Sequence, residues 1–197
     1  MPEHRPTLLA RRRAETQRVI QDHAVRLFAE RGYDATTVAD VAEAAGVSAM
    51  TVYRHFPTKE DLVLLDQRNE LVAGLVAASP ATDPVVRRVS RALVASAEAM
   101  TTTDDTPSLL ARLRLMTATP ALRAKHLDSH YALQRAIVDA LEPAPEEAFR
   151  TQAAVSACLG AMHTALVRWA ETDGETALPD LVAAALTAAL GPHALSG

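Results

Sequence analysis

The stretch that decides the fold is residues 32–62, GYDATTVADVAEAAGVSAMTVYRHFPTKEDL. Thr37 is followed three residues later by Asp40, a pairing typical of the first turn of a helix. Gly46 can end that helix because glycine tolerates a left-handed backbone, and Ser48 can cap a second short helix. Two short helices joined by such a tight turn predict a helix-turn-helix.

The chain on either side of this motif predicts a complete first domain. The motif itself covers residues 37–56, and Pro57 stops its second helix. An apolar stripe predicts a preceding helix over about 13–31, and a cap at Thr58 predicts a following helix that continues to the Ser79-Pro80 break. We therefore expect one domain over residues 13–75 and another over residues 76–197.

The second domain is also predicted to be helical. Alanine dominates the composition, whereas glycine and aromatic residues are scarce, and no stretch alternates apolar and polar residues as a strand would. Proline residues stand at the predicted helix starts, which suits the first turn of a helix. The expected helices cover about 84–100, 107–117, 120–141, 145–172 and 179–190, with a mobile loop at 101–106. The fold class is all-α with about nine helices.

The charge and composition narrow the class of protein. Of the 197 residues 49% are hydrophobic, and 20 basic against 24 acidic side chains give a net charge of -4. The charge is uneven, because residues 1–60 carry 9 basic and 8 acidic side chains and residues 61–197 carry 11 and 16. A single cysteine excludes a disulfide framework, and neither a secretory signal nor a membrane span is expected. We expect a cytoplasmic protein whose positive surface lies in the first domain.

The second helix of the motif has the side chains of a DNA-reading element. Its outward positions are expected to carry Ala49, Met50, Thr51, Tyr53, Arg54 and His55. Hydrogen-bond donors around a docking face bind phosphate, which positions a protein without reading sequence. Thr37, Thr51, Tyr53, His55 and Lys59 can supply such donors. Arg11 to Arg13 can add a basic arm or form a solvated tail.

These motifs together resemble the TetR family of bacterial transcriptional regulators. The resemblance rests on Gly32-Tyr33-Asp34-Ala35-Thr36-Thr37-Val38, Val41-Ala42, Ala45-Gly46-Val47-Ser48, Thr51-Val52-Tyr53-Arg54-His55-Phe56 and Lys59-Glu60-Asp61-Leu62. It covers residues 13–75 and implies a DNA-binding head followed by an effector-binding and dimerisation domain.

The resemblance also implies individual DNA contacts. Thr37, Tyr53, His55 and Lys59 would bind phosphate, and Ala49, Met50 and Thr51 would contact bases. Some relatives have Arg or Gln where this chain has Ala39 and Ala49, so bidentate purine readout is absent at both. We hypothesise apolar contact with thymine methyl groups and shape readout, with Arg54 supplying a guanine contact. Tyr53 has an alternative as a packing residue on the first helix.

Small residues recur on two helices of the second half, where backbones can approach closely. They are Ala153, Ala154, Ala157, Gly160, Ala161 and Thr164 on one helix and Ala183, Ala184, Ala185, Ala188 and Ala189 on the other. Such faces suit a symmetric four-helix packing of two copies, or an ordinary core within one chain. A homodimer would present two reading helices to a near-palindromic operator.

A small-molecule cavity is predicted from polar residues that interrupt an apolar stripe. Buried polar groups need partners, which a ligand can provide. The candidate ligand-binding residues are Met116, His130, Tyr131, Gln134, Met162, His163 and Trp169. For each of these residues, the alternative to ligand binding is a structural position in the core or on the surface. His126 and His130 have the spacing of a metal pair but no evident third ligand, so we expect no metal and no cofactor; Cys158 is expected to be buried.

The sequence thus predicts a dimeric repressor that a small-molecule effector releases from its operator, and repression rests on the family alone. The alternative is a small helical enzyme or ligand carrier. The sequence contains no nucleophile triad, carboxylate pair or phosphate loop that would support this alternative, so we expect no catalytic residue.

Overall fold

The computed structural model describes residues 8–64, 69–101 and 106–196, and within these ranges it contains nine α-helices and no strand. The prediction of an all-α fold is confirmed. The chain divides after Leu64 into two compact units, which are described separately below. This division puts the predicted boundary after residue 75 inside the second unit.

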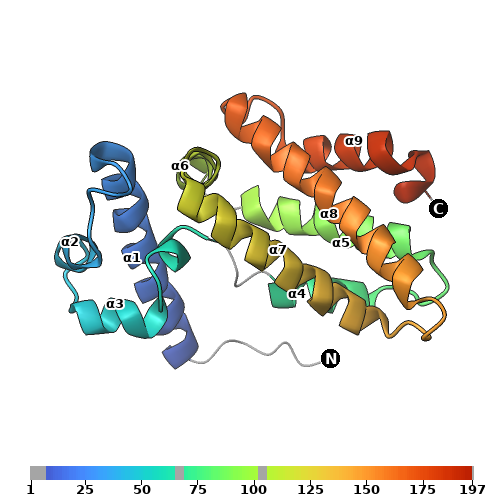
Figure 1. The fold of residues 1–197 in the computed structure, drawn as a ribbon, viewed down its shortest axis with the longest axis horizontal. Coiled ribbons are helices and arrows are strands. Elements are labelled where there is room, and N and C mark those ends of the chain that lie inside the picture. Colours follow the sequence, from blue (N-terminus) through green and yellow to red (C-terminus); the bar gives the residue numbers. More distant parts are fainter. Residues whose placement is uncertain (1–7, 65–68, 102–105, 197) are drawn as a thin grey trace. The chain divides into compact units, whose positions relative to one another are not determined.

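The first unit is a small helical domain built around α1 (Leu8–Arg31). It continues with α2 (Val38–Ala44), α3 (Ala49–His55) and a 3-10 turn, η1 (Glu60–Leu62) (Figure 1). Helix α2 packs on both α1 and α3, and η1 packs on α1. The core consists of side chains that are almost fully buried: Ile20, Ala24, Leu27, Phe28, Tyr33, Val41, Val52, Phe56 and Leu62.

Two predictions for this unit were wrong. Helix α1 begins at Leu8, so the exposed Arg12 and Arg13 lie in its first turns and not in an arm or tail; the Arg11 side chain is outside the described part. The expected helix from Thr58 to Ser79 is also not continuous. Among the described residues of this span, Glu60–Leu62 form η1, residues 63 and 64 lie outside any helix, and the next described helix is Asn69–Ala78. Leu62 to Leu64 are all buried, and three successive side chains spread over about 200° of a helix surface, so one helical face cannot bury them together.

The described part of the second unit contains six helices. They are α4 (Asn69–Ala78), α5 (Val85–Thr101), α6 (Thr106–Ala118), α7 (Pro120–Leu141), α8 (Ala148–Glu171) and α9 (Leu178–Leu190), followed by a 3-10 turn, η3 (Pro192–Ala194). The last five helices agree with the predicted ranges to within three residues at each end. Of the predicted loop at 101–106, residues 102–105 lie outside the described part, and its two end residues belong to α5 and α6.

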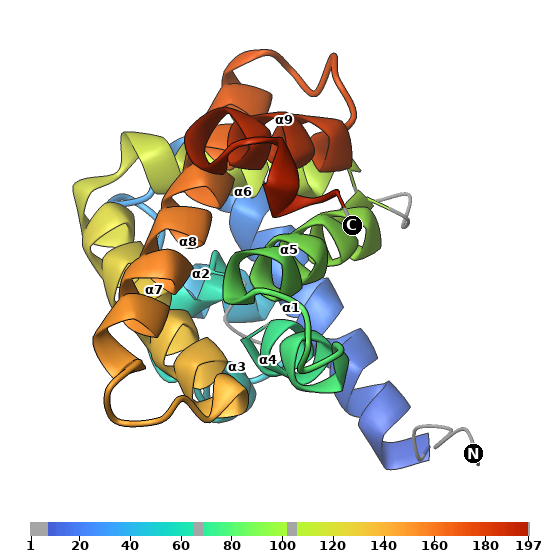
Figure 2. The same cartoon turned by 90° about the vertical axis from the view of Figure 1, so that its right-hand side faces the viewer.

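Helix α5 lies at the centre of this unit. It contacts α4, α8 and α9, and Figure 2 shows it between α4 and α9. Helix α8 contacts α5, α6, α7 and α9, so α6, α7 and α8 meet on one side of the unit. The Cys158 side chain is fully buried as predicted, and burial raises the pKa of its thiol. None of the described helices is long and apolar enough to cross a membrane.

Candidate DNA-binding surface and ligand cavity

The start of α2 is fixed by reciprocal hydrogen bonds between Thr37 and Asp40. The Thr37 backbone N–H and hydroxyl both donate to Asp40 Oδ2, at 2.7 and 2.6 Å, and the Asp40 N–H donates to Thr37 Oγ1 at 3.2 Å. The Thr37 hydroxyl bond, followed by the bond from its backbone, holds the pKa of Asp40 below its usual value. Thr37 is exposed at this helix start.

The turn between α2 and α3 has the predicted chemistry. Gly46 has φ +66°, and a Cβ at this position would have nothing within 4 Å. Glycine is therefore favoured by its backbone angle and not by a lack of space. Ser48 caps α3, because its Oγ accepts from the Thr51 N–H at 3.1 Å and lies 2.9 Å from the Thr51 hydroxyl.

Helix α3 turns one face outward and the other into the core. Val52 is fully buried, whereas Ala49, Met50, Tyr53 and Arg54 are exposed. The exposed fraction is 76% for Met50 and 49% for Tyr53. Of the predicted base-contacting and phosphate-contacting positions of this helix, Ala49, Met50 and Tyr53 therefore share the outward face, whereas Thr51 is half-buried and bonded to the Ser48 cap.

His55, at the end of α3, is directed partly inward. It is half-buried, and its Nδ1 atom is buried without a hydrogen-bond partner among the described residues. Burial lowers the pKa of His55, and the positive charges of Arg13 and Arg54 lower it further. The free protein therefore holds this imidazole in its neutral form near pH 7.

Lys59 is bound within the protein in a way that the sequence did not reveal. Its ammonium donates to the Tyr33 carbonyl oxygen and lies 4.2 Å from the centroid of the Tyr33 ring and 5.5 Å from that of Phe28. The Tyr33 hydroxyl donates to Glu60 Oε1 at 2.9 Å, and burial, reinforced by Glu60, raises the pKa of Tyr33. We call Phe28, Tyr33, Lys59 and Glu60 the Lys59 cluster. It ties the segment before α2 to the segment after α3.

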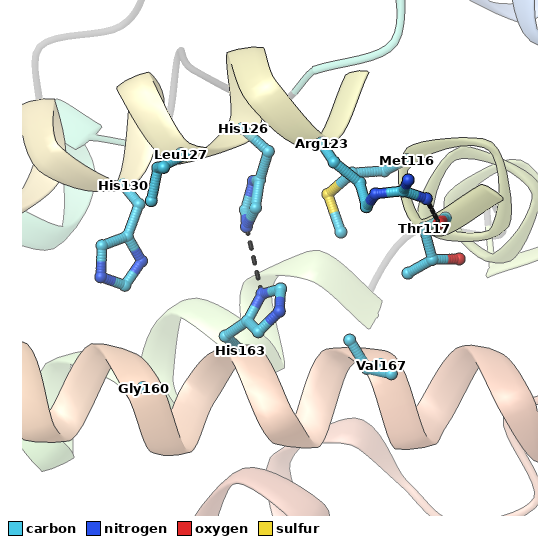
Figure 3. A pocket seen from close by; sticks show the side chains of 9 residues that line it. All are labelled: Met116, Thr117, Arg123, His126, Leu127, His130, Gly160, His163 and Val167. Atoms are coloured by element: carbon cyan, nitrogen blue, oxygen red, sulfur yellow. Dashed lines mark hydrogen bonds between the residues drawn. The ribbon is translucent and has the colours of Figure 1, made fainter. Parts of the chain in front are cut away.

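The second unit contains a cavity of about 460 Å³ between α6, α7 and α8 (Figure 3). Its walls are formed by Met116, Thr117, Arg123, His126, Leu127, His130, Gly160, His163 and Val167. His126 and His163 point toward each other from α7 and α8, with Nε2 of the first 3.2 Å from Nδ1 of the second. The volume lies within the range of small-molecule sites.

Three of the seven predicted ligand-binding residues line this cavity, namely Met116, His130 and His163. The other four do not. Tyr131 is 54% exposed, and the buried Gln134 donates to Ser156 Oγ at 2.6 Å, so its amide already has a partner. Met162 and Trp169 are buried in the core.

Six lining residues were not among those predicted: Thr117, Arg123, His126, Leu127, Gly160 and Val167. Of these, His126 has a sequence signal only as half of a possible metal pair with His130. In the structure His126 approaches His163 and stacks on it with ring centroids 5.2 Å apart. No group of three metal-ligating side chains occurs in the described ranges.

The small-residue faces of α8 and α9 divide between core and surface. Ala161 is buried, whereas Ala153, Ala157, Gly160 and Thr164 are exposed along one side of α8. On α9 the exposed members are Ala184, Ala188 and Ala189. Phe149, which is 80% exposed, extends the exposed side of α8 toward its first turn. The two helices pack on each other and offer a surface of small side chains.

Comparison with known proteins identifies both halves of the chain. Residues 20–65 match the family model of bacterial regulatory proteins of the tetR family, and residues 83–192 match that of the MftR C-terminal domain. The second match covers more than half of the chain. A stretch of 42 residues is 55% identical to the HTH-type transcriptional repressor KstR2 of Rhodococcus jostii and covers 21% of each protein.

Two solved structures share the fold. The fatty acid degradation regulator FadR of Bacillus halodurans aligns with a TM-score of 0.59 at 21% identity, over 90% of this chain and 95% of that one. Thermus thermophilus FadR, a repressor in complex with lauroyl-CoA, gives 0.53 at 24% identity, over 89% and 94%. The chain matches only about a fifth to a third of the length of the curated relatives. These relatives are regulators and not enzymes.

Proposed function

Because this chain belongs to the tetR family of bacterial regulatory proteins, we propose that it is a cytoplasmic repressor that binds operator DNA. The observation that carries the proposal is the outward face of α3. Met50, Tyr53 and Arg54 are exposed on a helix whose start is capped by Ser48 and whose preceding turn is built on Gly46. A short rigid helix of this kind enters the major groove, where its first residues meet base edges.

The DNA-binding residues of this proposal are Thr37, Ala49, Met50, Thr51, Tyr53, Arg54, His55 and Lys59. Their exposure divides them into two groups. Thr37, Ala49, Met50, Tyr53 and Arg54 are exposed, whereas Thr51, His55 and Lys59 are half-buried. The second group therefore holds the reading helix in position as well as contacting DNA.

A homodimer completes the operator-binding unit. One reading helix buries too little surface for specific affinity, whereas two related by a two-fold axis match a near-palindromic site. The exposed small residues of α8 and α9 support a symmetric interface, because small side chains let helices of two copies approach closely. Ala157, in the middle of the exposed side of α8, is the central residue of this proposed interface.

The cavity between α6, α7 and α8 supports a small-molecule effector. A ligand releases DNA only if it binds the DNA-free conformation more tightly than the DNA-bound one. A hundredfold preference would weaken operator binding a hundredfold at saturation, which is about 2.7 kcal/mol of coupling.

The test is binding of the full-length protein to a labelled duplex from the region upstream of its own gene, followed by fluorescence anisotropy. Affinity should fall steeply with salt, because phosphate contacts release counterions. Arg54→Gln and Thr51→Ala should weaken binding, and the second should also change base preference. Arg135→Gln, on the exposed surface of α7, is the control with the same charge change.

The competing function is a helical enzyme or ligand carrier. It predicts no salt-sensitive binding to this or any other duplex. Binding that is unaffected by both α3 substitutions would likewise contradict the assignment of α3 as the reading helix.

A further inference from the structure

All of the ionisable side chains among the described lining residues of the cavity in the second unit are basic. Its polar side chains include one permanent cation, Arg123, and three histidines, and no carboxylate lies among its described lining residues. Met116, Leu127 and Val167 provide apolar wall. A cationic ligand would meet the positive charge of Arg123 without a compensating carboxylate among the described lining residues, which is unfavourable.

Arg123 retains hydrogen-bonding capacity toward a ligand. Its Nη1 atom donates to the Thr117 carbonyl oxygen at 2.6 Å, which fixes the side chain at the α6 end of the cavity (Figure 3). It forms no ion pair with any described carboxylate. A guanidinium has five N–H donors in a planar fork, so several remain for an incoming anion.

The histidine pair lies on the adjacent part of the wall. In the bond between His126 and His163 one ring donates and the other accepts, and both side chains are half-buried. His130 is one turn along α7, and burial, with the charge of His163, lowers its pKa. Each imidazole carries at least one N–H, so the histidines of the wall can donate hydrogen bonds to an anion in the cavity.

We propose that the effector of this regulator is an amphipathic monoanion, such as a carboxylate or sulfonate with a compact apolar body. The anionic group binds Arg123 and the His126–His163 pair, and the apolar body contacts Met116, Leu127 and Val167. The proposal rests on the proposed effector function and specifies its ligand class. Because the anion competes for the imidazole N–H, its binding opens the hydrogen bond that joins α7 to α8.

Two dyes with a common apolar body test the role of the charge. The probes are 8-anilinonaphthalene-1-sulfonate and N-phenyl-1-naphthylamine, which differ by the sulfonate, and each is titrated into the full-length protein without DNA. The sulfonate should bind at least tenfold more tightly, as expected for charge-assisted hydrogen bonds. Arg123→Gln should remove most of this difference by weakening the sulfonate alone, and His163→Gln should do so in part. Arg135→Gln should change neither dye.

Equal affinity for the two dyes would overturn the proposal, as would an Arg123→Gln variant that loses both dyes equally while keeping its helical content. Decanoate and decan-1-ol, used as competitors, check that the site is shared by non-aromatic ligands, and only decanoate should displace the sulfonate. If the dye tests fail while the protein binds its operator, only the proposed ligand class is contradicted. An anion preference without any operator binding would contradict only the proposed function.

Discussion

Replacing Lys59 with methionine separates a structural role of this lysine from a role in phosphate binding. Methionine keeps an unbranched apolar stem but lacks the ammonium that bonds the Tyr33 carbonyl and lies over the Tyr33 ring. A cation over an aromatic ring at a partly exposed site is worth about 1 kcal/mol, and a hydrogen bond from a charged donor about 1.5 kcal/mol. Since both involve one ammonium, we expect a combined loss of about 2 kcal/mol in unfolding free energy.

The assay is urea unfolding of the full-length protein, with amide hydrogen exchange to locate the loss. Exchange should accelerate around Tyr33 and the start of α2, because the Lys59 cluster holds that segment. Arg54→Met is the matched control, since Arg54 is exposed and forms no hydrogen bond or ion pair among the described residues. It should change the unfolding free energy by less than about 0.5 kcal/mol while lowering operator affinity.

The salt dependence of operator binding provides the second readout. Loss of one phosphate contact reduces the slope of log affinity against log salt by about 0.9. The reasoning would be refuted if Lys59→Met left stability unchanged and reduced the slope by about 0.9. Lys59 would then be an ordinary phosphate ligand.

Three further outcomes are expected. Ser48→Ala removes the acceptor for the Thr51 N–H and should cost about 1 kcal/mol in urea unfolding; Ser48→Asp, which restores an acceptor, should recover most of it, and equal stability of all three proteins would argue against the cap. Burial, and then the charge of His163, lower the pKa of His130 in the native protein. The His130 imidazole therefore binds a proton at a higher pH in the unfolded chain than in the native protein. Unfolding free energy should therefore fall as pH drops below about 6.5, and His130→Gln should make that loss shallower; parallel pH curves would contradict it. Ala157→Arg should convert the proposed homodimer to monomers in sedimentation velocity with unchanged circular dichroism, whereas an intact dimer would place the interface elsewhere.

The helix-turn-helix could be predicted because its determining contacts are local. The partners in the Thr37 and Ser48 caps are three residues apart, so the sequence contains both halves of each interaction. The same rule failed at Thr58, where the capping contact with Asp61 is present but the helix ends after a single 3-10 turn. There the burial of several consecutive apolar side chains outweighs the local signal.

The cavity could be predicted only in part, because its walls come from three helices. The expected stripe on α7 correctly placed His130 in the cavity but also assigned Gln134 to ligand binding. The Gln134 amide instead donates a hydrogen bond to Ser156, which is 22 residues away on α8. The contact between His126 and His163 spans 37 residues. Nothing in the spacing of either helix indicates which faces of the two meet. The Lys59 cluster was missed for the same reason.

Trp169 makes the two units separable by spectroscopy. It is the single tryptophan of the chain and is only 2% exposed, and its backbone carbonyl accepts from the Gly174 N–H at 3.0 Å near the end of α8. The first unit contains tyrosines but no tryptophan. Emission excited at 295 nm therefore reports on the second unit alone. Melting of the first unit would leave that emission unchanged, while far-ultraviolet circular dichroism would register both units.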